Sequence, residues 1–179
     1  ADLMIGVGEQ IIISRPTIFG PEPVEFVNVV HSSLPYRLMA HTAEDLCEMH
    51  MSPELVNSCV HDDVHHGFVL AFREDHPEID LAELEWLVQA DIAANLPVEY
   101  TDENHIAVGG KLHQCSGPRT HVSATGKIYG FRLYPKIVCD MQQGRYLLIG
   151  FIGEHSEEEM RNLRESLEGN PVSHSLAFF

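Results

Sequence analysis

Two helix-start patterns, separated by a long stretch of strand-like sequence, limit the folds that this chain can adopt. Asp80 and Glu83 have the spacing of a capping box, and apolar residues follow at helical intervals until Pro97. Ser156 and Glu159 repeat this pattern near the C-terminus. The sequence therefore predicts two main helices, 80–96 and 156–168.

The remaining segments do not alternate regularly between strand and helix. Thr42 is expected to cap a short helix through Met49, and Ser52 followed by Pro53 to start another, which places short helices within 42–60. This order favours a single α+β domain over residues 1–179 with a mixed, mostly antiparallel sheet. The expected strands are Gln10–Ser14, Val24–Val30, Gly67–Arg73, Asn104–Val108, His121–Tyr129, part of Phe131–Met141, and Arg145–Ile152.

Composition excludes several classes of function. The longest apolar run is about seven residues, whereas a membrane span needs roughly 20. No basic segment followed by an apolar stretch marks the N-terminus for export, so a cytoplasmic location is expected. The 27 Asp and Glu against 11 Lys and Arg give a net charge of −16, which disfavours nucleic-acid binding. Such a surface suits solubility or a basic protein partner.

The cysteines indicate no local metal or redox motif. The four residues are too far apart for a C-x-x-C pair, and free thiols in a reducing compartment are expected. His113 and Cys115 stand two positions apart, so a strand would place both side chains on one face. A nearby imidazole can activate a thiol, but the pattern defines no third member, and a structural role for Cys115 is favoured.

The segment HDDVHH, residues 61–66, is a candidate metal site. If a helix continued through it, His61 and His65 would share a face at i, i+4 spacing, and Asp62 would add an oxygen ligand. Together with His31 and Asp91, the segment resembles the ligand set of HD-domain metal-dependent phosphohydrolases. A hydrophilic turn before a strand is the favoured interpretation, with the histidines dispersed through the fold.

A second hydrolase hypothesis uses two short elements, His31-Ser-Ser33 and His121-Val-Ser123. Paired H-x-S elements resemble those of two-histidine phosphoesterases, in which one imidazole acts as base and the other as acid. That resemblance implies a phosphate held by the hydroxyls of Ser33 and Ser123.

The order of elements from Gly67 to about Arg164 carries a longer resemblance. GFVLAFR, the Trp86 helix, the ENHIAVGG segment, the strands around FRLYPKIVCDM and the run RYLLIGFIGEHSEEEM resemble the order in suppressor-of-fused-like domains. In that family Glu usually stands where this chain has Val69, and the first 60 residues have no counterpart. The resemblance implies a binding scaffold, since animal members hold a transcription factor and many bacterial relatives look like immunity proteins.

Sequence alone thus favours a non-enzymatic protein-binding module with an acidic surface and without a cofactor, for example a protein of the inhibitor or immunity type. The alternative is a phosphoester hydrolase that uses either a divalent transition metal or the two-histidine pair. The two hypotheses differ in one structural expectation. A metal site requires at least three of the ligand side chains to converge, whereas a binding module leaves the histidines scattered.

Overall fold

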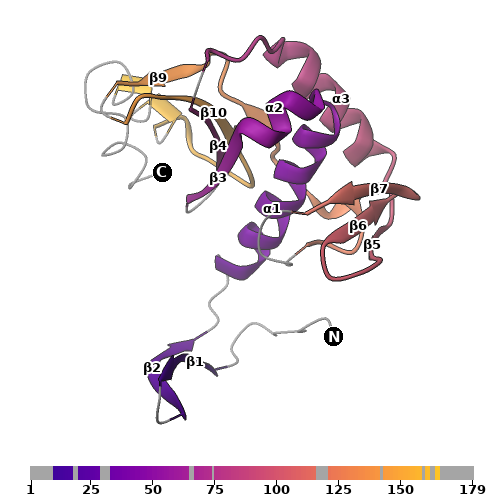
Figure 1. The fold of residues 1–179 in the computed structure, drawn as a ribbon. Coiled ribbons are helices and arrows are strands. Elements are labelled where there is room, and N and C mark those ends of the chain that lie inside the picture. The colour runs from indigo at the N-terminus through magenta and orange to yellow at the C-terminus, as the bar shows by residue number, and fades with distance from the viewer. Residues whose placement is uncertain are drawn as a thin grey trace. The chain divides into compact units, whose positions relative to one another are not determined.

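The computed structural model describes residues 10–17, 20–28, 33–64, 67–73, 75–115, 121–141, 143–158, 160–161 and 164–165 (Figure 1). The chain divides into two compact units, Ala1–Pro35 and Tyr36–Phe179. In the first unit, β1 (Gln10–Thr17) and β2 (Gly20–Asn28) form an antiparallel hairpin. The two strands predicted at the N-terminus are confirmed.

The second unit combines helices with two antiparallel sheets, which confirms the α+β prediction. Helix α1 (Ser33–Met49) begins in the first unit and continues through the second. The other helices are α2 (Pro53–Ser58), α3 (Leu81–Ala93) and the 3₁₀ turn η1 (Thr125–Lys127). The strands are β3 (Cys59–Val64), β4 (Gly67–Phe72), β5 (Val98–Tyr100), β6 (His105–Val108), β7 (Lys111–Gln114), β8 (Arg132–Leu133), β9 (Val138–Asp140) and β10 (Arg145–Phe151).

The main sheet has β4 at its centre. Its strand order is β3-β4-β10-β8, with β9 paired to β10, and every pairing is antiparallel. Phe68 and Leu70 belong to one apolar cluster and Val69 and Ala71 to another, because successive side chains of a strand point to opposite faces. Both clusters are buried, which explains why β4 is a continuous apolar run rather than an alternating one.

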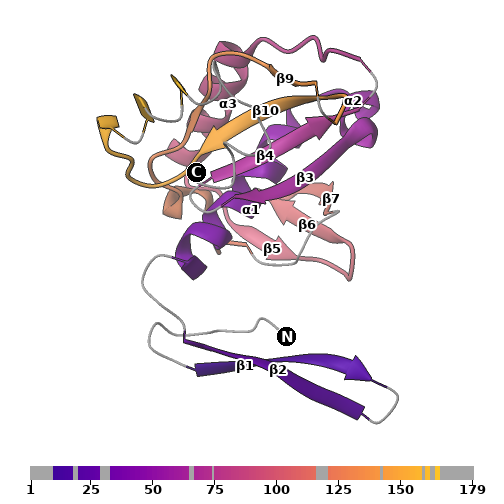
Figure 2. The same ribbon diagram turned by 90° about the vertical axis from the view of Figure 1, so that its left-hand side faces the viewer.

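Helix α1 lies between the main sheet and the small sheet β5-β6-β7 (Figures 1 and 2). Its apolar residues Met39, Ala43 and Leu46 join the cluster that contains Phe68 of β4 and Ile106 of β6. The helix therefore has few positions that face solvent, and its polar residues must be accommodated inside the fold.

Two local predictions are confirmed in detail. Asp80 caps α3, accepting a hydrogen bond from the Glu83 N–H at 3.0 Å, and Ser52 caps α2 in the same way. Residues 157–158, 160–161 and 164–165 are helical, where the second main helix was expected; the rest of 156–168 lies largely outside the described residues.

Two other predictions about secondary structure are wrong. The helix expected to begin at Thr42 begins at Ser33, because Pro35 falls within its first turn, where a missing N–H costs no helical hydrogen bond. The strand expected at 121–129 is instead a loop with one bridge, Pro97 to Ala124, followed by η1. Within the residues described, no helix has the length and apolar character needed to span a membrane.

Candidate metal centre

The buried side of α1 carries three carboxylates. Glu44, Asp45 and Glu48 are each no more than 3% exposed at the side chain. Spacings of three and four residues place them on neighbouring turns of one helix side. Burying a carboxylate is costly unless it is paired and hydrogen-bonded, so this helix face requires cationic partners.

Strand β3 supplies the first partner. His61 pairs through Nδ1 with Glu44 Oε2 at 3.2 Å and through Nε2 with Glu48 Oε1. Cys59 precedes it by two positions, and its thiol lies in a group with Glu48 and His61 whose ligand atoms are all within 4.8 Å of one another. Alternation along the strand explains why both side chains reach the same place.

Strand β7 supplies the second partner from the opposite side of α1. His113 Nε2 lies 3.1 Å from Glu48 Oε2 and 3.5 Å from Asp45 Oδ1. Cys115 follows two positions later, and its thiol lies 3.6 Å from Asp45 Oδ2. The third member that the H-x-C pattern lacked is therefore a carboxylate from a distant helix.

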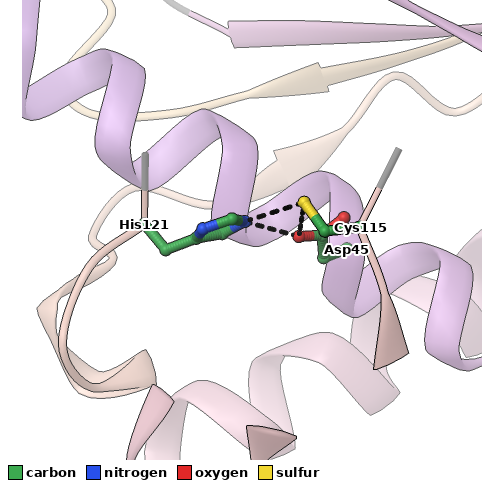
Figure 3. Close-up of side chains that lie close together, drawn as sticks. All are labelled: Asp45, Cys115 and His121. Carbon is green, nitrogen blue, oxygen red and sulfur yellow. Dashed lines mark hydrogen bonds and ion pairs between the residues drawn. The ribbon is translucent and has the colours of Figure 1, made fainter. Parts of the chain in front are cut away.

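His121 completes the cluster from the loop before η1 (Figure 3). Its Nε2 donates to Asp45 Oδ2 at 2.6 Å and lies 3.6 Å from the Cys115 thiol. On the other side of the ring, Nδ1 is 3.2 Å from the Tyr100 hydroxyl, whose oxygen also accepts the backbone N–H of His121. Tyr100 thus fixes the orientation of an imidazole that is only 1% exposed.

Imidazoles and carboxylates alternate through the cluster in the order His121, Asp45, His113, Glu48, His61 and Glu44. Burial opposes charge on the three carboxylates and on His61 and His113.

Pairing overcomes burial at two carboxylates and at two imidazoles. Burial tends to raise the pKa of Asp45, but hydrogen bonds from His113 and His121 lower it to about 2. Burial likewise opposes protonation of His61, yet its carboxylate partners raise its pKa to about 10. In the same way, the pKa of His113 rises to about 9, and that of Glu48 falls. Without a metal, His61 and His113 are therefore held in the cluster as imidazolium–carboxylate pairs at neutral pH.

Glu44 and Cys59 behave differently. Burial raises the pKa of Glu44 despite its contact with His61. Its second oxygen, Oε1, is buried without a hydrogen-bond partner among the described residues. The pKa of the Cys59 thiol is raised by burial and by the charges of Glu48 and Glu44. A cation in the cluster would relieve both conditions, because it accepts a carboxylate oxygen and deprotonates a coordinating thiol.

The predicted site residues are only partly brought together. His61 and His121 lie in the cluster, whereas Asp91 is paired with His50 at 2.7 Å and Ser123 accepts a hydrogen bond from Lys127. His31 and His65 lie outside the described residues, as do the side chains of Ser33 and Asp62. The favoured interpretation of the opening of HDDVHH as a turn is wrong, because residues 61–64 belong to β3.

Sequence reasoning missed most of the centre. It named neither the three carboxylates of α1 nor Cys59 as ligands, and it treated His113 and Cys115 as an isolated pair. Two signals were available: C-x-H at 59–61 and H-x-C at 113–115 both place a thiol and an imidazole on one face of a strand. All four cysteines are free thiols, as expected. A scan against models of known protein families and a search of curated proteins found no match to this chain.

Proposed function

We propose that this protein is a metal-dependent hydrolase whose centre binds a divalent transition metal, with zinc as the first candidate. The observation that carries the proposal is the convergence of three imidazoles and two thiols on three buried carboxylates of α1. These ligands come from four segments of the chain, 44–48, 59–61, 113–115 and 121. The histidines of this cluster are gathered rather than dispersed, which is what the metal hypothesis requires.

The chemistry of the donors favours a transition metal over magnesium or calcium. Hard cations take oxygen ligands almost exclusively, whereas nitrogen, sulfur and oxygen together suit zinc and its neighbours. The number of donors also exceeds the four of a structural zinc site, and the three carboxylates outnumber the two thiols. Such a site is suited to leave one coordination position of the metal ion for water.

Hydrolysis is the reaction that this arrangement serves best. A bound zinc ion lowers the pKa of its water and stabilises charge on a phosphoryl or carbonyl oxygen. Glu44 contacts the ligand His61, and its Oε1 has no hydrogen-bond partner among the described residues, so we assign to Glu44 the role of accepting a proton from such a water. His61 and His113, at 13% and 11% side-chain exposure, give solvent limited access to the cluster. Phosphoesters are the first substrate class to examine.

Metal analysis of untagged protein tests the proposal. We expect zinc, manganese or iron in at least equimolar amount, lost together with phosphoesterase activity in His113→Ala. His105→Ala is the matched control, because His105 belongs to the same small sheet but pairs with the exposed Asp102. Wild-type protein that carries no metal and binds none when it is added would contradict the proposal.

A protein-binding role is the second candidate. Trp86 on α3 is 66% exposed, and exposed tryptophan is enriched at protein interfaces. The net charge of −16 would speed encounter with a basic partner. This is the role that the resemblance to suppressor-of-fused-like domains implies. Its test is a partner of basic charge whose affinity falls in Trp86→Ala and is unchanged in His113→Ala.

A further inference from the structure

We propose that the centre holds two metal ions rather than one. The first ion would be bound by Asp45, Cys115 and His121, and the second by Glu48, Cys59 and His61. This inference rests on the proposed function, because it concerns the same cluster. It assigns one triad to each ion and puts His113 between the two triads.

The two triads have the same composition and no residue in common. Each contains one carboxylate, one thiol and one imidazole, and in each the ligand atoms lie within 4.8 Å of one another. Each carboxylate comes from α1, and the two are three positions apart on that helix. A single mononuclear site has no need of two complete sets of ligands.

In Asp45 and Glu48, the two oxygens of each carboxylate face different imidazoles. Asp45 turns Oδ2 toward His121 and Cys115 and Oδ1 toward His113. Glu48 turns Oε2 toward His113 and Oε1 toward His61. His113 is therefore within reach of both triads and forms a third group with Asp45 and Glu48. Carboxylates with oxygens facing different metal ligands are suited to bridge a two-metal site.

Two of the three separations in the first triad, which Figure 3 draws, match those around a tetrahedral ion. With Zn–N and Zn–O near 2.1 Å and Zn–S near 2.3 Å, tetrahedral ligands are separated by about 3.4 Å for N and O and about 3.6 Å for pairs with S. Both contacts of the Cys115 thiol, to Asp45 and to His121, are 3.6 Å. The 2.6 Å contact between His121 and Asp45 is a hydrogen bond that would open as the metal replaces its proton.

Charge balance also favours two ions. When a metal binds, the thiols ionise and the imidazoles become neutral, which leaves three carboxylates and two thiolates in one buried cluster. One divalent ion would leave most of that negative charge uncompensated, whereas two would nearly neutralise it. Buried charges are tolerated only when they are compensated. Glu44 contacts His61 of the second triad, and its Oε1, which has no hydrogen-bond partner among the described residues, would be compensated by a cation there.

Titration of metal-free protein with cobalt(II) tests the inference. We expect two ions per chain, with thiolate-to-cobalt absorbance rising through both equivalents. Cys59→Ser and Cys115→Ser should each remove one ion and about half of that absorbance, and the double variant should lose all of it. Cys139→Ser is the control, because Cys139 is exposed on β9 and outside the cluster, and it should bind like the wild type.

The outcomes separate the two proposals. A stoichiometry of one, with both cysteine variants affecting the same ion, would overturn the two-ion inference and leave the proposed function intact. A stoichiometry of zero would overturn both. Because a serine in the cluster can disturb folding, Asp45→Asn and Glu48→Gln provide a second pair of variants. Each should lose one ion while circular dichroism of the metal-free protein stays that of the wild type, and loss of neither ion would refute the assignment.

Discussion

Asp45→Asn in metal-free protein provides a quantitative test of the paired cluster. The substitution keeps the shape of the side chain but removes the charge that His113 and His121 share. Asp45 is 2% exposed, so solvent does little to replace the lost interaction. A fall of the carboxyl pKa from 3.8 to about 2 corresponds to ~2.5 kcal/mol of stability at pH 7. We expect the free energy of unfolding to fall by about that amount.

The pH dependence provides the stricter part of this test. Because the folded pKa is lowered, the stabilisation is present at neutral pH and is lost as the pH falls through the unfolded and then the folded value. The difference between variant and wild type should therefore shrink to about half at pH 3. Urea denaturation in the presence of a chelator measures this difference in the free energy of unfolding. The exposed pair of Asp102 and His105 provides the control, and Asp102→Asn should change stability little. Equal stability of Asp45→Asn and wild type at pH 7 would refute the reasoning.

Two other predictions concern the same metal-free protein. Raising the pH should lower the midpoint of its thermal unfolding. The protonated His61 and His113 stabilise the fold fully below their unfolded pKa of 6.5, and this stabilisation is lost as the pH rises through their folded pKa values of about 10 and 9. A midpoint that stays constant up to pH 10 would contradict the pairing. Thr42→Val should cost about 1–3 kcal/mol in urea denaturation, because the buried Thr42 hydroxyl accepts the Val122 N–H at 3.0 Å. Thr101→Val, at an exposed hydroxyl, should change stability little, and an equal loss in both variants would show that the contact to Val122 is unimportant.

Much of the fold was predictable because it depends on local chemistry. The caps at Asp80 and Ser52 and the apolar run of β4 are encoded by a few adjacent residues, and each element formed where it was expected. The strand expected at 121–129 did not form because long-range contacts compete there. Thr125 donates to the carbonyl of Asp91 and accepts the N–H of Leu96, which ties the segment to the end of α3.

The centre was less predictable because its members meet only in three dimensions. Glu44, Asp45 and Glu48 have the pattern of a solvated helix face, and the sequence alone does not show that this face is covered by β3 on one side and β7 on the other. His61 was recognised as a candidate, but with Asp62, His65, His31 and Asp91 as its partners. Its actual partners are 13 and 17 positions earlier, on a helix that begins nine residues before its predicted start.

The position of all three carboxylates on α1 has a consequence for how the centre could assemble. A helix rises about 1.5 Å per residue, so Asp45 and Glu48 are offset along its axis by about 4.5 Å as soon as that helix forms. The helix itself thus spaces the oxygen ligands, whereas the nitrogen and sulfur ligands come from β3, from β7 and the residue after it, and from the loop before η1. Any selectivity among metals would then depend on how β3 and β7 pack against α1. Substitutions in these strands could change that selectivity during evolution without altering the helix.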